Sequence, residues 1–287
     1  MKILQSIPKH WNLTPAELKT IYDLEVIQAH KLNTAIPEER KKLYTKLYDE
    51  YFAALPFHPQ FKVKHDDSFK TEKINYLLKA TVPFLMNNNT FVEIGAGDCS
   101  LSKAIAQKGF NTFALDVSET ISKSIENEKS NNNFNFICFD GFNLPFEANS
   151  IDVFFSNQLL EHLHPDDVLE QTRNINSCLK SNGKYICITP NKLTGPHDIS
   201  RFFTNKNVGF HLKEYSAYNL HSLFRKSNFN KIKFYSMILG KYYKIPSCML
   251  FSFEFLARII PLNMRRIILN KTILNRLTNY ICIAFKK

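Results

Sequence analysis

The sequence predicts an α/β protein with a doubly wound, mostly parallel sheet of seven strands, helices on both faces and a helical extension before it. Two observations lead to this class. From residue 90 onward, short apolar runs alternate with helical stretches, and such alternation gives a parallel sheet covered on both faces. Before residue 90, the apolar residues repeat at helical spacing instead. The 287 residues are enough to enclose one large core.

The expected N-terminal helical extension covers residues 1–88. Thr14-Pro15-Ala16-Glu17 is a capping box with proline at the first helical position, so it opens a helix that runs to about residue 33. A second helix begins near Pro37. Its apolar stripe, at a spacing of four, consists of Leu43, Leu47, Tyr51 and Leu55. A third helix is expected over about 68–86.

The remaining residues, 89–287, form the expected sheet domain. Its first five strands are predicted at 90–95, 111–116, 134–140, 151–157 and 183–189. Helices are predicted at about 100–108, 118–127, 166–180 and 215–227. Phe229 to Ile238 and Tyr280 to Phe285 are apolar enough to be the sixth and seventh strands. Residues 241–278 are then an insertion before the last strand, and we expect it to be helical.

A glycine-rich turn follows the first predicted strand, within Phe91-Val-Glu-Ile-Gly-Ala-Gly-Asp-Cys-Ser100. Gly95 and Gly97 permit a tight turn and let a cofactor approach the backbone. A nicotinamide-binding fold has G-x-G-x-x-G, but the third glycine position here is Ser100. Glu93 precedes the turn, where its charge would repel a pyrophosphate but attract an ammonium group. The turn therefore favours a cofactor other than a dinucleotide.

Acidic and polar residues end the next strands. Asp116 lies at the end of the second strand, where a carboxylate can accept hydrogen bonds from both ribose hydroxyls. Asp140-Gly141 ends the third strand, and Ser156-Asn157-Gln158 ends the fourth, followed by Glu161-His162-Leu163.

In their order and spacing, these segments from about Thr90 to Thr189 resemble the class I, Rossmann-like, S-adenosylmethionine-dependent methyltransferases. The resemblance implies that S-adenosylmethionine is the cofactor, with its methionine part beside the glycine turn, its ribose at Asp116 and its adenine at Asp140. Cys99 departs from the pattern, because many members have a further glycine there. The cofactor-binding residues that the resemblance implies are Glu93, Gly95, Ala96, Gly97, Asp116, Val117, Asp140, Gly141 and Asn157.

The long loop from Thr189 to Tyr215 is expected to face the methyl acceptor, because long loops at the carboxyl end of a parallel sheet usually carry function. A sugar hydroxyl needs a general base as it attacks, and histidine is the usual choice. We therefore expect His211 or His197 to be that base. The alternative is that His197 closes a turn and His211 caps a helix. No metal site is expected, because the pair His162-x-His164 lacks a nearby carboxylate or thiolate cluster.

Two further segments, Tyr48 to Gln60 and Gly209 to Tyr215, are more loosely similar to methyltransferases found among bacterial surface-glycan genes. This similarity implies O-methylation of a sugar or another small hydroxyl compound. The alternative is N- or carboxyl-methylation of a small metabolite. Binding to nucleic acid, as in an RNA methyltransferase, is less favoured, because Ser156 to Leu159 stands where amino-methylating nucleic-acid enzymes carry Asn/Asp-Pro-Pro-Tyr.

The positive charge is concentrated at the C-terminal end. The chain has a net charge of +11, and residues 241–287 contain nine Lys and Arg against one acid. These bases are interleaved with dense apolar residues, so 241–287 could meet an anionic membrane, a second copy of the chain in a homodimer, or the protein's own N-terminal helices. Scattered cysteines and the absence of a signal-peptide pattern lead us to expect a cytoplasmic protein, peripheral at most to the inner face of the membrane.

Overall fold

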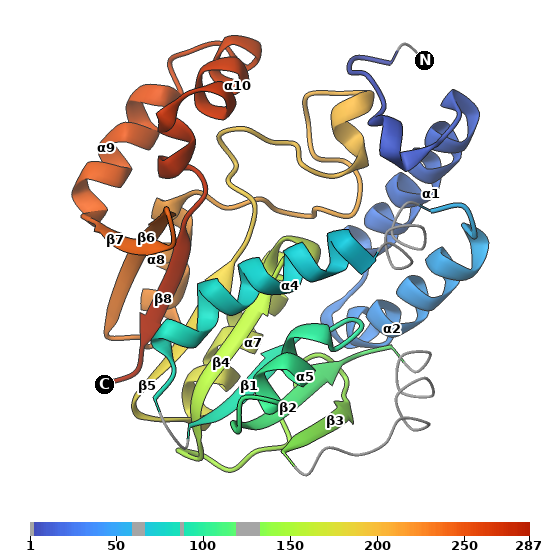
Figure 1. Cartoon of the computed structure of the whole chain (residues 1–287). Helices are drawn as coiled ribbons and strands as arrows, with labels where there is room; N and C mark the ends of the chain where they lie inside the picture. The colour runs from blue at the N-terminus through green and yellow to red at the C-terminus, as the bar shows by residue number, and fades with distance from the viewer. Residues whose placement is uncertain (1–2, 59–66, 87–88, 119–132) are drawn as a thin grey trace.

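An eight-stranded sheet forms the centre of the structure (Figure 1). The computed structural model describes residues 3–58, 67–86, 89–118 and 133–287. The strand order is β3-β2-β1-β4-β5-β8-β6-β7, in which β1 to β5 are parallel, β8 is antiparallel to both β5 and β6, and β7 is antiparallel to β6. The strands are β1 Thr90–Ile94, β2 Asn111–Asp116, β3 Phe134–Cys138, β4 Ile151–Asn157, β5 Leu179–Ile188, β6 Lys231–Ile238, β7 Lys241–Ile245 and β8 Ile281–Phe285. The predicted α/β class with a mostly parallel sheet is confirmed.

The sheet has one strand more than predicted. The extra strand, β7, occupies the start of the insertion that we expected to be helical, and it forms a hairpin with β6. Leu239 and Gly240 join the two strands, both with positive φ (51° and 76°), as a two-residue hairpin turn requires. The rest of the insertion is helical, with α9 Ser247–Ala257, α10 Leu262–Lys271 and the short η5 Ile273–Leu277.

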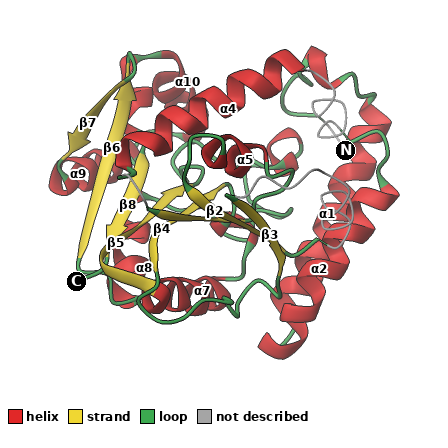
Figure 2. Ribbon diagram, turned by 60° about the horizontal axis from the view of Figure 1, so that its bottom comes forward, coloured by secondary structure: helices red, strands yellow, loops and turns green. Residues whose placement is uncertain are grey.

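Helices cover both faces of the sheet (Figure 2). On one face lie α4 (Asp67–Thr81) and α5 (Ser100–Ala106), and on the other α7 (Pro165–Cys178) and α8 (Ala217–Lys226). Alternate residues of β4 pack on opposite faces: Val153 and Phe155 on the α4–α5 side, and Phe154 on the α7–α8 side. Because both faces are covered, consecutive residues in the middle of β4 are apolar and buried. The helix predicted at 118–127 lies largely outside the described residues.

The N-terminal helices α1 (Pro15–Thr34) and α2 (Pro37–Ala54) pack against the sheet domain. The predicted capping box begins α1: the Thr14 side chain accepts from the Glu17 amide, and the Glu17 carboxylate accepts from the Thr14 amide. Residues of α1 and α2 share a buried cluster with the short helix η4 (Ile199–Phe202) of the long loop. The third predicted helix is α4, which ends at Thr81 and is followed by η2 (Val82–Phe84). The division of the chain at residue 88 remains a prediction.

A buried ion pair joins α2 to α7. Arg40 donates from Nε and Nη2 to the two carboxylate oxygens of Asp167, at 2.7 and 2.8 Å. The Tyr44 hydroxyl also donates to Asp167, at 2.8 Å. Hydrogen bonding to Asp167 raises the pKa of Arg40 although burial opposes it. Because Arg40 and Asp167 are both buried, their charges depend on each other for compensation.

Candidate functional site

The glycine-rich turn lies at the carboxyl edge of the sheet, between β1 and α5. The amides of Gly95 and Ala96 donate to the carbonyl of Leu115 in β2, at 2.8 and 3.1 Å, so the turn is held against the neighbouring strand. Gly95 and Gly97 have φ of 70° and 53°, a region that favours glycine. A Cβ built on Gly97 would meet no atom within 4 Å. The space beside Gly97 is therefore open to a ligand, as the predicted cofactor cradle requires.

Cys99 follows this turn and adopts a left-handed conformation, with φ of 57°, at the N-cap of α5. Its side chain makes no capping hydrogen bond to the helix. A non-glycine residue in this conformation carries strain. The backbone at this position is therefore one that a glycine would adopt without cost, and the cysteine occupies it at the expense of that strain.

Asp116 reaches the turn from the end of β2. Its two carboxylate oxygens accept from the amides of Gly97 (2.8 Å) and Ser118 (3.1 Å). A carboxylate has about four lone-pair sites, so these two bonds leave acceptor capacity for ribose hydroxyls. Burial raises the pKa of Asp116 although backbone hydrogen bonds lower it. The geometry fits the ribose of the predicted cofactor.

Glu93 lies beneath the turn and is almost fully buried. Its Oε2 accepts from the backbone amide and the hydroxyl of Ser102, in the first turn of α5, at 3.1 and 2.5 Å. Burial raises the pKa of Glu93 to about 8. The carboxyl group therefore anchors α5 to β1, while its contact with the methionine part of a cofactor stays a prediction.

The ends of β3 and β4 complete this edge. Asp140 accepts from the amides of Phe142 and Asn143 at 2.8 and 2.7 Å. Its pKa, which partial burial raises, is held below the ordinary value by these hydrogen bonds. Gly141 has a φ of 88°, and Asn157 ends β4 half-buried. Parallel pairing of β3, β2, β1 and β4 brings these residues to the same edge as Asp116.

The long loop from Thr189 to Tyr215, which we call the acceptor loop after its predicted role, brings the two predicted histidines together through Glu214. The Oε1 atom of Glu214 accepts from the backbone amide of His197 at 2.6 Å and lies 2.9 Å from Nδ1 of His211. The His197 ring points elsewhere: its Nε2 is 3.0 Å from both the carbonyl of Asn191 and the hydroxyl of Thr194. The His197 ring therefore contacts residues of its own loop, and His211 forms a histidine–carboxylate pair that spacing alone did not reveal; the catalytic role of either histidine stays a prediction.

The pair favours one tautomer of His211. An ionised Glu214 can only accept a hydrogen bond, so Nδ1 then carries the proton and Nε2 carries the lone pair. Burial lowers the pKa of His211 to about 4, so the ring is neutral near pH 7. The ring of His162 meets it edge to face, with centroids 4.9 Å apart. Burial also lowers the pKa of His162, to about 3, and its Nδ1 lies 3.1 Å from the carbonyl of Phe210.

Three residues here could also offer atoms to a metal ion. One atom each from Glu161, His162 and His211 lies within 4.8 Å of the others, the one such group found in the described part of the chain. The sequence did not reveal it, because His211 is distant from Glu161-His162 in the chain. His164 is not part of the group and instead caps α7 by accepting from the Asp166 amide at 3.3 Å. A structural zinc site would need a fourth ligand.

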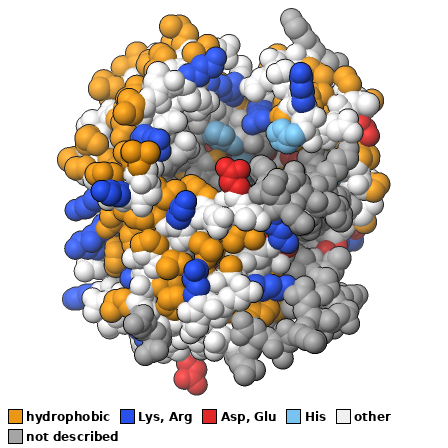
Figure 3. All heavy atoms as spheres, viewed as in Figure 1, with side chains coloured by type: hydrophobic (Ala, Val, Ile, Leu, Met, Phe, Trp, Pro, Cys, Tyr) orange, Lys and Arg blue, Asp and Glu red, His pale blue; other side chains and the backbone are white. Residues whose placement is uncertain are grey.

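Residues of α1 and α2 contact the acceptor loop. Glu25 is buried, and its Oε2 accepts from the Phe210 amide at 3.1 Å while Oε1 accepts from the Tyr51 hydroxyl at 2.8 Å. Burial, with the charge of Asp198 nearby, raises the pKa of Glu25 to about 8. Asp198 in turn accepts from the His211 amide at 3.2 Å. Figure 3 shows histidine side chains in a hollow at the middle of this face, beside an acidic side chain.

A family model and several known proteins match part of this chain. Residues 92–187 match a family model described as a methyltransferase domain. An uncharacterized protein of Methanocaldococcus jannaschii is 29% identical over 156 residues, which is 54% of this chain and 62% of that protein. Phosphoethanolamine N-methyltransferase 1 of Caenorhabditis elegans is 30% identical over 105 residues, 36% of this chain and 22% of that enzyme. The chain thus spans less than two thirds of the length of these relatives.

Solved structures share the fold. The 1,6-didemethyltoxoflavin-N1-methyltransferase of Burkholderia thailandensis, solved with S-adenosylhomocysteine, has a TM-score of 0.52 at 15% identity and covers 88% of this chain and 91% of its own. A SAM-dependent methyltransferase from Archaeoglobus fulgidus has a TM-score of 0.50 at 19% identity, covering 75% of this chain and 94% of its own. At these identities the likeness concerns the fold.

Proposed function

We propose that this chain, in which residues 92–187 form a class I, S-adenosylmethionine-dependent methyltransferase domain, methylates a hydroxyl group of a sugar or another small polar acceptor. The observation that carries the proposal is the pairing of His211 with Glu214 at 2.9 Å on the acceptor loop. An imidazole oriented by a carboxylate is an arrangement suited to removing a hydroxyl proton. We place the reaction in cytoplasmic surface-glycan biosynthesis, on the looser similarity of Tyr48 to Gln60 and Gly209 to Tyr215.

The cofactor of this domain, S-adenosylmethionine, supplies a methyl group on a positively charged sulfur when bound. The residues placed to hold it are those of the glycine turn, Asp116, Asp140 and Asn157. His211 then accepts the hydroxyl proton at Nε2, while Glu214 keeps the ring in place and stabilises the imidazolium that forms. Glu25 and Asp198 hold the loop backbone at Phe210 and His211, so they fix the position of the base relative to the cofactor edge.

Methylation of an amine is the second candidate, because several relatives are named phosphoethanolamine N-methyltransferases. The matched segment of each covers about a fifth of that relative's length. An amine needs less help from a base than a hydroxyl does. A base held by a carboxylate therefore supports the hydroxyl acceptor over the amine.

The two candidates differ in the bond that forms. We would incubate the protein with ¹³C-methyl S-adenosylmethionine and panels of sugar nucleotides, free sugars, phosphoethanolamine and small carboxylic acids. The ¹³C shift of the new methyl group distinguishes an O-methyl ether, an N-methyl amine and a methyl ester. O-methyl ether formation on a sugar supports the proposal, and transfer to phosphoethanolamine alone contradicts it.

Asp116→Ala tests the cofactor site. The substitution removes the acceptor that faces the ribose, and losing hydrogen bonds to a charged group costs about 1.5–3 kcal/mol, so the Kd for S-adenosylmethionine should rise roughly 10- to 150-fold. Isothermal titration calorimetry measures this. Asp166→Ala, which removes an exposed carboxylate of α7, is the matched control. An unchanged Kd in folded Asp116→Ala protein would show that the ribose is held elsewhere.

A further inference from the structure

Exposed apolar side chains concentrate on the insertion between β6 and β8. Of the fifteen large hydrophobic residues with high exposure in the described part of the chain, nine lie between Leu239 and Ile273. We call eight of them the α9–α10 surface: Tyr243, Met249, Phe255, Leu256, Ile259, Met264, Ile267 and Ile273. Figure 3 shows hydrophobic side chains along the rim of the molecule where Figure 1 places α9 and α10. A concentration of this kind marks an interaction site.

The two helices of this surface differ in composition: α9 is mostly apolar and contains no Lys or Arg, and α10 contains Arg265, Arg266 and Lys271 but no acid. On α10, Met264 and Ile267 are exposed and Lys271 follows on the same face, four residues after Ile267. On α9, Met249 and Leu256 are seven residues apart and both exposed, and Ile259, which follows the helix, is 74% exposed. Each helix therefore presents an apolar stripe to solvent.

The charge around these stripes is positive. Lys241, Lys244, Arg258, Lys271 and Arg276 are exposed. The sole acid in 241–287, Glu254, points inward: it is buried and accepts from the Ala217 amide at 2.8 Å and from Asn191 at 3.1 Å. The Glu254 carboxylate is therefore occupied by hydrogen bonds inside the protein, and the outer face of the insertion has no acid to offset its bases. This charge favours an anionic partner.

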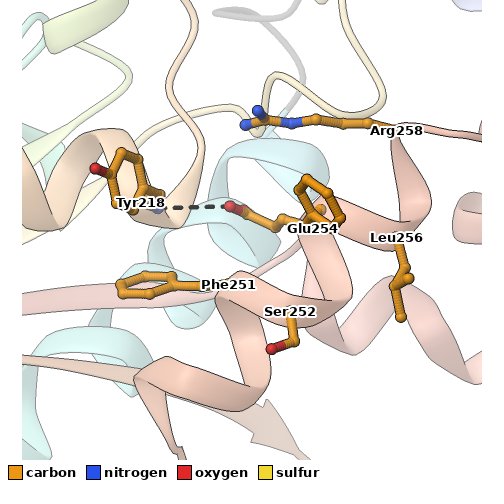
Figure 4. Close-up of a pocket in the computed structure, with 7 residues that line it drawn as sticks. Tyr218, Phe251, Ser252, Glu254, Leu256 and Arg258 are labelled. Carbon is orange, nitrogen blue, oxygen red and sulfur yellow. Dashed lines mark hydrogen bonds between the residues drawn. The ribbon is translucent and has the colours of Figure 1, made fainter.

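A pocket opens between α8 and α9 on the same insertion (Figure 4). Aromatic and aliphatic side chains form most of its wall, and Arg258 extends its guanidinium group at the rim. The lining residues are Tyr218, Phe251, Ser252, Glu254, Phe255, Leu256 and Arg258. The lining thus combines apolar walls with one cation, Arg258, and one carboxylate, Glu254.

The opposite side of α10 is hydrogen-bonded to the acceptor loop. Arg265 donates to the carbonyl of Leu193 at 2.7 Å, and Arg266 donates to the carbonyls of Thr194 and Gly195 at 3.2 and 2.6 Å. The α9–α10 surface is thus attached directly to the loop that carries His197 and His211. A partner bound to this surface would lie close to the acceptor site.

We propose that the α9–α10 surface docks the protein on an anionic membrane, with the apolar stripes inserted among the lipid head groups and the exposed bases on their phosphates. No helix within the described residues is long and apolar enough to span a bilayer, so the contact is peripheral. The chemistry is that of an interfacial helix pair, in which apolar insertion and charge attraction add. Docking places the acceptor loop beside the membrane surface.

Vesicle co-sedimentation tests the proposal with the full chain. Vesicles of phosphatidylcholine with about 30% phosphatidylglycerol, an anionic lipid, are compared with pure phosphatidylcholine, at low and at physiological salt. We expect sedimentation with the anionic vesicles that weakens as salt rises. The variants Ile259→Ser/Ile267→Ser and Arg258→Glu/Lys271→Glu should each reduce binding at least about tenfold.

Matched variants elsewhere on the surface serve as controls. Ile27→Ser/Ile36→Ser alters residues of comparable exposure in α1 and in the connection between α1 and α2, and Lys31→Glu/Lys108→Glu makes the same change of charge at exposed sites. Both should bind like the unaltered protein. Failure of the folded protein to sediment at either salt overturns the proposal, and so does an equal loss in test and control variants.

The alternative to a membrane is that a second copy of the chain covers the α9–α10 surface in a dimer. Light scattering that shows a dimer abolished by Ile259→Ser/Ile267→Ser, without vesicle binding, would assign the surface to dimerisation and overturn the membrane proposal. The assay reads lipid binding and mass, not methyl transfer. Membrane binding can therefore be disproved while the proposed methyl transfer stands, and methyl transfer can be disproved while membrane binding stands.

Discussion

Replacing His211 with alanine should lower turnover by a factor of about 10²–10⁴ and leave the Kd for S-adenosylmethionine unchanged. The reason is the position of the ring: Nδ1 faces Glu214, so Nε2 is the atom that can take a proton from the acceptor. Glu214→Gln should also lower turnover, because an amide can no longer stabilise the imidazolium that proton transfer creates. Single-turnover kinetics with the identified acceptor, together with calorimetry of cofactor binding, would measure both effects.

The variant His197→Ala distinguishes the role of His197 from that of His211. It keeps the backbone amide that Glu214 accepts from and removes only the ring that contacts Asn191 and Thr194, so we expect a loss of a few-fold. His30→Ala, exposed on α1, controls for removing a histidine. If His197→Ala abolishes turnover and His211→Ala does not, the base is His197. If neither matters, the base lies elsewhere or none is needed.

Adding EDTA to the turnover assay tests whether a metal ion bound by Glu161, His162 and His211 is needed. Turnover that is unchanged by EDTA would agree with a proton-transfer role for His211. Turnover lost to EDTA and restored by a divalent cation would instead assign these three residues to a metal ion, and the general-base prediction for His211 would be wrong.

Arg40→Met should lower the free energy of unfolding by about 3–5 kcal/mol, because it leaves the Asp167 carboxylate buried without its cation. Asp167 accepts two hydrogen bonds from Arg40 and one from Tyr44 in a site closed to solvent. The double variant Arg40→Met/Asp167→Leu should recover part of the loss, since neither charge then remains buried. Urea denaturation monitored by circular dichroism gives the free energies.

Lys46→Met is the matched control on the same helix. Lys46 pairs with Glu50 at 3.8 Å, with both side chains largely in solvent, and such exposed pairs contribute little. A small effect of Lys46→Met beside a large effect of Arg40→Met would show that α2 is an integral part of the folded domain. Equal small effects would show that α2 is attached mainly by its apolar residues.

The local parts of this protein follow from its sequence. The capping box at Thr14, the glycine turn after β1 and the acid ending β2 each depend on a few neighbouring residues, and parallel strands bring their carboxyl ends to one edge whatever the rest of the chain does. The edge of the sheet at which we predict the cofactor therefore follows from the sequence alone. The presence of strand β7 does not, because its turn, Leu239-Gly240, lacks the Asn-Gly or Asp-Gly signal of a two-residue hairpin.

The acceptor side was decided by tertiary packing. Glu25 meets the Phe210 amide across 185 residues of sequence, and it does so because Leu18 and Ile21 of α1 pack on Ile199 and Phe202 of the loop. Glu214 lies 2.9 Å from Nδ1 of His211, three residues away in the chain, and burial of that ring, which lowers its pKa to about 4, comes from the tertiary packing around it. Sequence spacing shows only which residues are near one another in the chain. Burial of apolar helix residues against the long loop lowers the free energy, and this packing decides which polar groups are enclosed with them.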